Sequence, residues 1–330
     1  MGKYLITGIT GFIAPYFIIP LINKGHEVTG LARDKNKISS LEDSLSPSQF
    51  KELISSQKLS FIEGDITNYK SMEKLFSENK FDGVFHLAGI CTQNKILKDP
   101  YSAFITNSLG TVNIVDAIEK HQPNCKLMYM STSAVYGSHE NSIDEFAVIN
   151  PLTPYGTTKA AADIYVKERA ITKNLPFFIT RVFNVSGPTH QEEISLGYFA
   201  STIIKIEKGL LPPVIKVGRL DSKRTFLDTR DLAEVCADLM EIPQKSGEIY
   251  NIGADKLYTM GELLDKMIEI RNLQNKIKIE QDPKLIRPVE IKIQTPDSTK
   301  AKKLTGWKSK IPIENTLTDL LNHYDKKYRL

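Results

Sequence analysis

The sequence predicts an α/β fold, a doubly wound parallel sheet with a smaller C-terminal α/β lobe. Through the first half of the chain, short apolar runs alternate with longer helical patterns, which is typical of parallel strands joined by helices. After about residue 185 the pattern changes to turns and shorter elements. We therefore expect a first domain over residues 1–184 and a second lobe over residues 185–330, with some strands and helices of the second part returning to the first domain.

The individual elements follow from the spacing of the apolar residues. Short apolar runs predict strands over residues 4–6, 27–31, 59–62, 83–86, 126–130 and 177–180. Longer patterns predict helices over residues 12–24, 70–78, 101–121, 157–173, 231–240, 261–269 and 313–328. The intervening segment 37–58 is rich in Ser and Lys, so we expect a helical or loop insertion between the second and third strands.

Composition argues against several classes of partner. The net charge of +4 comes from 43 basic and 39 acidic residues without a dense basic block, so we expect no nucleic-acid binding. Cys91, Cys125 and Cys236 are widely spaced, which predicts neither a disulfide framework nor a metal site and fits a reducing cytoplasm. The longest apolar run, residues 12–22, is too short for a membrane span. A strand pattern begins directly after Met1, so we expect no cleavable signal and no membrane association.

A glycine-rich turn between the first strand and the first helix indicates dinucleotide binding. Gly8 and Gly11 occupy the first two glycine positions of a Gly-x-x-Gly-x-x-Gly pattern, and Ala14 occupies the third. Backbone amides at such a turn can receive a pyrophosphate. The sequence therefore predicts a Rossmann domain, in which the two halves of the parallel sheet meet at the ligand.

The ends of the next strands indicate which dinucleotide is bound. An NAD enzyme usually carries an acidic residue after the second strand, whereas here Arg33 comes first and Asp34 follows. This order favours NADP(H) and leaves NAD(H) possible. After the third strand, Asp65 is expected to hold the adenine amino group. After the fourth strand, small residues around Ala88 let the backbone lie beside the cofactor.

Tyr155 and Lys159 form a pair that can perform acid–base chemistry. On a helix, four residues are about one turn, so the phenol and the ammonium share one face. A phenol normally titrates near pKa ~10, and a neighbouring cation favours its ionised form. The spacing therefore predicts an acid–base tyrosine whose pKa is lowered by the lysine.

Six motifs stand in order along the first half of the chain. They are Thr7-Gly8-x-x-Gly11-Phe12-Ile13, Gly64-Asp65, His86-Leu87-Ala88, Asn107-x-x-Gly110-Thr111, Ser131-Thr132-Ser133-Ala134-Val135-Tyr136-Gly137 and Tyr155-x-x-x-Lys159. In combination they resemble the extended short-chain dehydrogenase/reductase family that acts on nucleotide sugars, and the similarity covers nearly the whole chain.

The resemblance implies a role for each matching residue. Thr132 and Tyr155 would hydrogen-bond the C4 oxygen of the sugar, and Lys159 would hold the nicotinamide ribose. Hydride would pass between C4 of the sugar and the nicotinamide ring. The implied cofactor contacts are Gly8, Thr10, Gly11, Phe12, Ile13, Arg33, Asp65, Ile66, Leu87, Ala88, Tyr155 and Lys159.

Motifs of the second lobe narrow the resemblance to one branch of the family. They are Arg181-Val182-Phe183-Asn184-x-x-Gly187-Pro188, Lys216-Val217-Gly218-Arg219-Leu220-Asp221-x-x-Arg224-Thr225-Phe226-Leu227-Asp228 and Asp282-Pro283-x-x-x-Arg287-Pro288-x-Glu290. They resemble the GDP-mannose 4,6-dehydratase and GDP-4-keto-6-deoxy-mannose reductase branch. The resemblance implies a GDP-sugar whose diphosphate and nucleoside ribose are held by Asn184, Arg224, Arg287 and Glu290, with Ser133 and Val217 as further substrate contacts.

Two departures from the pattern of that branch involve three positions. Dehydratases carry a glutamate two residues after the catalytic threonine, and this chain has Ala134 there. A methyl group cannot abstract a proton, so the departure speaks against dehydration unless an acid of the following loop, Glu140, Asp144 or Glu145, folds back. Ser186 and His190 replace residues that vary among sugar-specific members, so a hexose and a heptose both fit. His190 follows the Gly187-Pro188 turn, and we expect it to be a solvated loop residue and not a substrate contact.

These observations predict an NADP(H)-dependent reductase that delivers hydride to the C4 ketone of a GDP-linked 4-keto-6-deoxy sugar. A C4 epimerase with tightly bound NAD is the main alternative. A dehydratase is disfavoured by Ala134, and a silent nucleotide-binding scaffold by the intact set of Thr132, Tyr155 and Lys159. Many relatives pair two long helices from each subunit, so we expect a homodimer or homotetramer built on residues 101–121 and 157–173.

Overall fold

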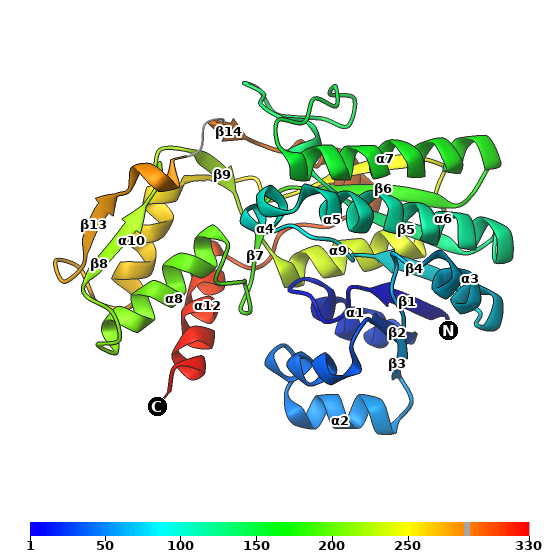
Figure 1. Ribbon diagram of the computed structural model, residues 1–330, viewed down its shortest axis with the longest axis horizontal. Helices are drawn as coiled ribbons and strands as arrows, with labels where there is room; N and C mark the ends of the chain where they lie inside the picture. The colour runs from blue at the N-terminus through cyan, green and yellow to red at the C-terminus, as the bar shows by residue number, and fades with distance from the viewer. Residues whose placement is uncertain (287–290, 330) are drawn as a thin grey trace.

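A computed structural model describes residues 1–286 and 291–329, and its centre is a seven-stranded parallel sheet with helices on both faces (Figure 1). This confirms the predicted fold class. The strands lie in the order β11-β6-β5-β4-β1-β2-β3, so the direction in which strands are added reverses between β1 and β4. Their bounds are β1 Lys3–Thr7, β2 Glu27–Ala32, β3 Leu59–Glu63, β4 Gly83–His86, β5 Lys126–Thr132, β6 Phe177–Val182 and β11 Glu248–Ile252.

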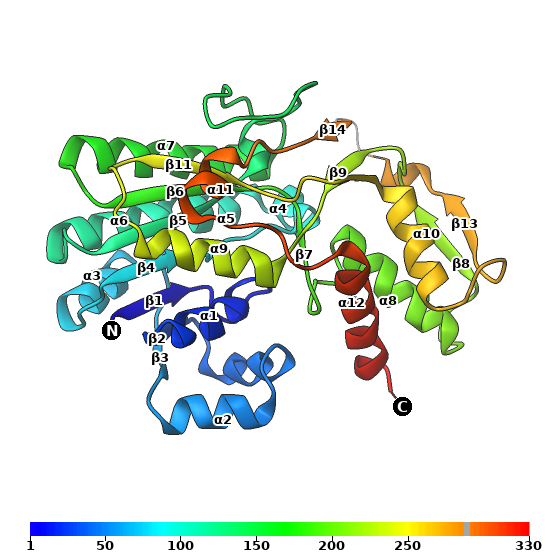
Figure 2. The same ribbon diagram turned by 180° about the vertical axis from the view of Figure 1, so that it is seen from behind.

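The two faces of the sheet are covered by different sets of helices. One face packs against α3 (Tyr69–Glu78), α6 (Gly110–His121) and α7 (Pro154–Lys173). The opposite face packs against α1 (Ile18–Asn23), α9 (Thr229–Glu241) and α11 (Thr299–Thr305), as the reverse view shows (Figure 2). Both faces of the sheet are therefore buried, which explains why the sequences of the central strands are continuous apolar runs and not alternating patterns.

The seventh strand, β11, comes from the second half of the chain and was not predicted from the sequence. It pairs in parallel with β6 over five residues, from Glu248 opposite Phe178 to Ile252 opposite Val182. Its five residues include Tyr250 and the buried Asn251, so they do not form a continuous apolar run. The chain therefore returns to the first sheet after it has built part of the second lobe.

Several helices differ from their predicted bounds. The predicted helix 12–24 divides into a 3₁₀ turn, Ala14–Phe17, and the short helix α1. The predicted helix 101–121 divides into α5 (Pro100–Phe104), a π turn (Ile105–Leu109) and α6. The predicted insertion 37–58 forms a 3₁₀ helix, Lys35–Asp43, and α2 (Pro47–Ser55), whereas α7 begins three residues earlier than predicted because Thr153 caps it.

The second lobe has an apolar core of its own. This core gathers residues from α8 (Ser195–Glu207), α10 (Met260–Ile270), α12 (Ile313–Lys327) and strand β8 (Val214–Val217). Small sheets complete the lobe and join it to the first domain. Their strands are β7 Val185–Ser186 with β10 Leu227–Asp228, β8 Val214–Val217 with β13 Lys278–Gln281, and β9 Lys223–Thr225 between β12 Leu257–Thr259 and β14 Ile293–Gln294.

Remaining short elements are α4 (Gln93–Lys98) and the 3₁₀ turns Ser133–Val135 and Pro283–Leu285. Within the described part of the chain, no helix combines the length and the apolar character that a bilayer crossing needs.

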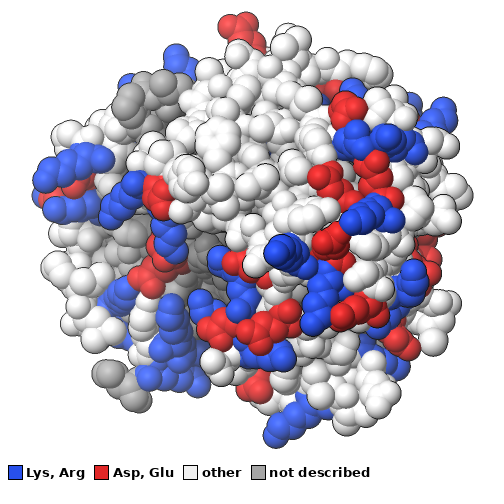
Figure 3. All heavy atoms as spheres, turned by 45° about the vertical axis from the view of Figure 1, so that its right-hand side comes forward, with Lys and Arg blue, Asp and Glu red and all other residues white. Residues whose placement is uncertain are grey.

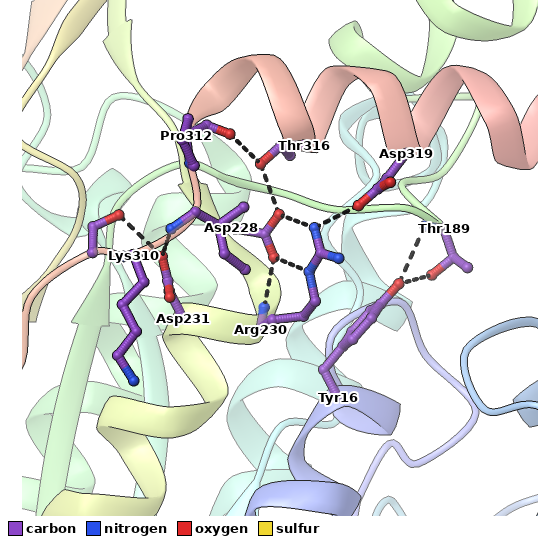
Figure 4. A network of polar contacts seen from close by, with 11 residues as sticks. Tyr16, Thr189, Asp228, Arg230, Asp231, Lys310, Pro312, Thr316 and Asp319 are labelled. Carbon is purple, nitrogen blue, oxygen red and sulfur yellow. Dashed lines mark hydrogen bonds and ion pairs between the residues drawn. The ribbon is translucent and has the colours of Figure 1, made fainter. Parts of the chain in front are cut away.

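A polar network fastens the start of α9 to α12 (Figure 4). The Asp228 carboxylate is fully buried, and it accepts hydrogen bonds from the backbone and guanidinium of Arg230 and from the Thr316 hydroxyl at 2.7 Å. Arg230 also forms a 2.8 Å ion pair with the half-exposed Asp319. Asp228 therefore caps one helix and holds the other through the same two oxygens.

We expect Asp228→Ala to lower the free energy of unfolding by about 3 kcal/mol, because it leaves the partly buried Arg230 without its main partner and uncaps α9. Asp319→Ala is the matched control, since it removes the exposed partner of the same guanidinium and should cost at most about 1 kcal/mol. Urea unfolding at neutral pH measures both values. Equal losses in the two variants would contradict this role for Asp228.

Candidate active site

The glycine-rich turn lies at the point where the strand order of the sheet reverses. Gly8 follows β1 and has a φ of +70°, a conformation that favours glycine. A Cβ atom at Gly8 would lie 2.8 Å from the Cα of Ala88, which follows the neighbouring strand β4. The Gly11 amide closes the turn by donating to the Gly8 carbonyl at 2.8 Å. Two bare stretches of backbone thus meet at the crevice where sheets of this kind bind ligands.

His86 holds the ends of β1 and β4 together through a continuous chain of hydrogen bonds. Its Nδ1 lies 2.8 Å from the Thr7 hydroxyl and its Nε2 lies 3.0 Å from the Thr111 hydroxyl. The Thr111 hydroxyl donates to the Asn107 carbonyl, so it must accept from Nε2–H, and the Thr7 hydroxyl then donates to Nδ1. The Thr7 oxygen remains free to accept from the amides of Leu87 and Ala88.

Burial lowers the pKa of His86 to about 3, so its imidazole stays neutral in this chain of bonds. Asn107 extends the network, because its side chain bonds both backbone groups of Ile90 and the Thr158 hydroxyl. Asn107 lies in the π turn before α6, and π turns of this kind frequently occur at functional sites. The network therefore ties the turn after β4 to α7.

The rest of the turn contacts the second lobe. Thr10, Phe12 and Ile13 are half-buried, and the Phe12 ring stacks on His190 with centroids 4.7 Å apart and planes 8° from parallel. The expectation that His190 is a solvated loop residue is wrong: it is 3% exposed and its Nδ1 lies 3.0 Å from the Ser186 hydroxyl. Burial lowers its pKa to about 4, so the ring is neutral and able to stack closely on Phe12.

After β2 and β3, one predicted cofactor residue is exposed and the two acidic residues form local hydrogen bonds. Arg33 is exposed and has no ion-pair partner within residues 1–286 and 291–329. Asp34 caps the following 3₁₀ helix by accepting from the Asn36 amide at 2.9 Å. Asp65 accepts from the backbone and hydroxyl of Thr67, both at 2.9 Å, and Ile66 is buried beside it.

Thr132, Tyr155 and Lys159 come together at the carboxyl end of β5. Thr132 is the last residue of β5, and Tyr155 and Lys159 lie one turn apart at the start of α7. A Cβ atom at Gly156 would lie only 2.5 Å from the Ala134 carbonyl oxygen. The first turn of α7 therefore packs directly on the turn after Thr132, which brings the tyrosine to the threonine.

The pKa values of Tyr155 and Lys159 are governed by burial. Burial raises the pKa of Tyr155, the neighbouring Cys91 raises it further, and a hydrogen bond with Thr132 acts in the opposite direction. This differs from the predicted lowering, because the low-dielectric surroundings disfavour the phenolate. Burial likewise lowers the pKa of Lys159 to about 7, although Asp163 and Cys91 favour its charged form. The Lys159 ammonium lies 4.2 Å from the centre of the Tyr129 ring.

Cys91 is a site residue that the sequence analysis missed. The residue as a whole is exposed, but its thiol influences the pKa of both Tyr155 and Lys159, and burial of the thiol raises its own pKa. The available signal was its position five residues after His86, in the segment that leaves β4 at the crevice. Among residues 1–286 and 291–329, no three His, Cys, Asp or Glu side chains gather in the manner of a metal site.

None of the three loop acids expected as substitutes for a glutamate at position 134 is bonded to Thr132, Tyr155 or Lys159 by a contact that the structure shows among the described residues. Glu145 accepts a 2.8 Å hydrogen bond from the Asn251 amide of β11. Asp144 accepts from the Phe146 amide at 3.0 Å within its own turn, and Glu140 is exposed on the loop.

The predicted substrate residues are distributed over both lobes. Asn184 lies after β6, and its side-chain nitrogen is buried without a hydrogen-bond partner among the residues that the structure describes. Ser133 and Val217 are buried, at 4% and 3% exposed. The Arg224 guanidinium donates to the backbone carbonyls of residues 223, 291 and 292, which lie beside it. The two remaining predicted residues, Arg287 and Glu290, fall outside the described residues.

Comparisons with known proteins agree with this geometry. The sequence model of the GDP-mannose 4,6 dehydratase family matches residues 5–320. The chain is 27% identical over 251 residues to GDP-6-deoxy-D-mannose reductase from Pseudomonas aeruginosa, covering 75% of this chain and 82% of the relative. It is 28% identical over 352 residues to UDP-glucose 4-epimerase from Pisum sativum, covering 97% and 95%. A solved structure of RMD from Pseudomonas aeruginosa complexed with NADPH has a TM-score of 0.81 at 23% identity, covering 99% and 100% of the two chains.

The lowered pKa of Lys159 predicts a pH-dependent contribution to stability. Between pH 7 and pH 10.5, the ordinary value, the unfolded chain keeps a proton on Lys159 that the folded chain has lost. Stability therefore increases with pH in this window, and the wild type should gain about 1.4 kcal/mol per pH unit relative to Lys159→Met. Urea unfolding at pH 7, 8 and 9 measures the difference. Lys167→Met removes an exposed lysine from the same helix, and an equal slope for that control would contradict the assignment.

Proposed function

Because the chain belongs to the GDP-mannose 4,6 dehydratase family, whose members are NAD(P)-dependent enzymes of nucleotide-sugar metabolism, we propose that it is a reductase of this type. In this proposal it transfers hydride from NADPH to the C4 ketone of a GDP-4-keto-6-deoxy sugar, a hexose or a heptose. Residues 1–184 bind the dinucleotide and carry the catalytic side chains. Residues 185–330 bind the nucleotide sugar, and parts of them return to complete the first domain.

The crevice fits a dinucleotide. The backbones of Gly8 and Ala88 approach so closely that a Cβ at Gly8 would clash with Ala88, and in this proposal amides of the turn from Thr10 to Ile13 bind the pyrophosphate. In this proposal Asp65 and Ile66 border the adenine, and Leu87 and Ala88 border the nicotinamide side. Bound there, the nicotinamide supplies or accepts a hydride.

Each catalytic side chain has a distinct role in the proposed reduction. Tyr155 donates its phenolic proton to the C4 oxygen as hydride adds to the C4 carbon, so the C=O bond becomes CH–OH. Thr132 donates a hydrogen bond to the same oxygen and orients it. Lys159, one turn further, holds the nicotinamide ribose and, as an ammonium, stabilises the phenolate that remains. The Tyr155 phenol is protonated at neutral pH, so it holds the proton that the reduction needs. Burial raises its pKa and thus makes the phenolate costly, which is why the Lys159 ammonium is needed to stabilise it.

In this proposal, Ala134 is the residue that favours reduction at C4 over dehydration. Dehydration needs a base at C5, and general-base assistance is typically worth about 10²–10⁴-fold. The methyl group of Ala134 supplies no base, and Glu145, the most buried of the three loop acids, is occupied with the Asn251 amide. Hydride transfer to C4 needs only the proton that Tyr155 provides.

The substrate would lie between the crevice and the second lobe. The unpartnered Asn184 amide offers a buried donor, and a buried donor without a partner is costly unless a ligand or water satisfies it. Arg224 adds a guanidinium suited to phosphate oxygens. In this proposal, Ser133 and Val217 border the site, and Arg287 and Glu290 also bind the diphosphate and the ribose.

A C4 epimerase is the second candidate, and the comparisons give a specific reason to keep it. The 28% identical UDP-glucose 4-epimerase spans 97% of this chain, whereas the reductase relative spans 75%. An epimerase keeps NAD bound through purification and consumes no cofactor. Analysis of the nucleotide released on denaturation therefore separates it from a reductase.

We also propose that the protein assembles as a homodimer or homotetramer through α5, α6 and α7. α5 and α7 expose large apolar side chains, with Tyr101 at 75%, Ile164 at 55% and Ile171 at 56%, and Leu109, in the π turn before α6, is 44% exposed. Figure 3 shows a broad upper area with few charged side chains, in contrast to the charge-rich lower part of the same face. Exposed large apolar side chains on neighbouring helices, in an area with few charges, are typical of subunit interfaces.

The test of the proposed reaction is consumption of NADPH in the presence of GDP-4-keto-6-deoxy-mannose, followed by absorbance of the reduced nicotinamide. We expect turnover by the wild type and a loss of about 10²–10⁴-fold in kcat for Tyr155→Phe, because the proton donor is removed. Tyr165→Phe, on the same helix with its hydroxyl bonded to Asp116, should retain kcat. No cofactor consumption by the wild type, together with released NAD, would replace the reductase by the epimerase.

Arg33 provides a test of the cofactor. In this proposal its exposed guanidinium binds the 2′-phosphate of NADPH, which NADH lacks. Arg33→Ser should therefore raise KM for NADPH about tenfold or more and leave KM for NADH within about twofold. Lys35→Ser is the control, since it removes another exposed cation two residues away. Equal changes in KM for NADPH and NADH would show that Arg33 does not bind the 2′-phosphate.

A further inference from the structure

A buried side-chain contact joins the catalytic turn to the strand that adjoins the substrate lobe. The Ser133 hydroxyl donates to Gln294 Oε1 at 3.0 Å, and Gln294 Nε2 donates to the Ser133 carbonyl at 2.9 Å. Both residues are 4% exposed, so water cannot readily replace either bond. The two partners are 161 residues apart in the sequence, and Ser133 directly follows Thr132.

On its other side, the strand of Gln294 adjoins a predicted substrate residue. β14 pairs in parallel with β9, and Gln294 lies opposite Arg224 in the register. The Arg224 guanidinium donates to the carbonyls of Ile291 and Lys292, and the Lys223 amide donates to Lys292 at 2.8 Å. The segment just before β14 is therefore bound to the residue that we propose for the diphosphate.

Further contacts make this connection rigid. The Ile143 amide donates to the Thr295 carbonyl at 2.9 Å, and the Asp297 amide donates back to Ile143 at 2.8 Å. The Ile143 carbonyl also accepts from the side chain of Asn251 at 2.9 Å. Hydrogen bonds to Ile143 thus hold the backbone on the C-terminal side of Gln294. Because Gln294 has little freedom to move by itself, we expect a displacement of β14 to move the Ser133 turn as well.

We propose that Gln294 is a positioning residue that sets the catalytic turn relative to the bound nucleotide diphosphate. This inference rests on the proposed function, in which Thr132 contacts the reacting oxygen and Arg224 contacts the diphosphate. Gln294 touches neither group. It acts through Ser133, because two reciprocal hydrogen bonds fix both the distance and the orientation of the turn, which apolar contact would leave adjustable.

The test compares Gln294→Met with Gln122→Met. Methionine keeps the length of the side chain and removes its amide in both cases. Gln122 is a suitable control because it is also buried and makes three hydrogen bonds, to Phe76, Asn79 and Phe81, but lies before β5 at the opposite end of the sheet. We expect Gln294→Met to lower kcat about tenfold or more, with the Kd for GDP changed less than about threefold. Gln122→Met should lower thermal stability and leave kcat within about twofold.

A second readout does not depend on turnover. Binding of GDP, or of UDP if that is the nucleotide bound, should slow amide hydrogen exchange in residues 131–137 of the wild type and of Gln122→Met, but not of Gln294→Met. If Gln294→Met does not fold, Ser133→Ala removes one of the two bonds, the one from the hydroxyl, and should weaken this protection. The wild type could show this protection, and Gln294→Met could lose it, even if the wild type does not reduce the nucleotide sugar. That result would support the role of Gln294 and reject only the proposed reaction. A Gln294→Met protein with full protection and unchanged kcat would overturn the inference, as would a wild type in which the bound nucleotide gives no protection at 131–137.

Discussion

The position of α7 on the sheet depends on one buried ion pair. Arg181, in β6, donates to both carboxylate oxygens of Asp163, in α7, at 3.0 and 2.8 Å, and the two side chains are 3% and 0% exposed. Removing both charges from water is costly, and the pair persists because the Tyr136 hydroxyl and the Glu145 carbonyl also accept from the guanidinium. These bonds connect α7, β6 and the loop after the catalytic turn. The helix that carries Tyr155 and Lys159 therefore cannot slide along the sheet without leaving a buried charge unpaired.

The same burial that fixes the helix also sets the proton chemistry of the site. A low-dielectric crevice opposes every charged form, so the phenol of Tyr155 keeps its proton and the ammonium of Lys159 loses its proton easily. Asp163 acts in the other direction and keeps the lysine able to carry charge near neutral pH. The ion pair with Arg181 thus has two consequences: it places Lys159, and it supplies the nearby carboxylate that supports the ammonium.

Sequence reasoning predicted the parts of the molecule whose signals are local. Six strands of the sheet, the glycine-rich turn and the spacing of Tyr155 and Lys159 depend on neighbours within a few residues. Features that depend on distant contacts were not predictable. β11 joins the sheet because β6 lies open beside it, and His190 is buried because Phe12, far away in the sequence, stacks on it. Cys91 enters the site only through the path of the chain after β4, and the rise in the pKa of Tyr155 follows from burial that spacing alone does not reveal.

The turn after β5 explains how one scaffold can support different reactions at a single position. The Ala134 amide donates to the Thr132 hydroxyl oxygen, its carbonyl lies against Gly156, and Gln294 holds the preceding residue. Every one of these contacts uses the backbone of the turn or a neighbouring side chain, and none uses the side chain at position 134. A carboxylate or a methyl group can therefore occupy that position on the same backbone. Under the proposed function, the difference between dehydration and simple hydride transfer lies in this one side chain, while the contacts that align Thr132 with Tyr155 are common to both.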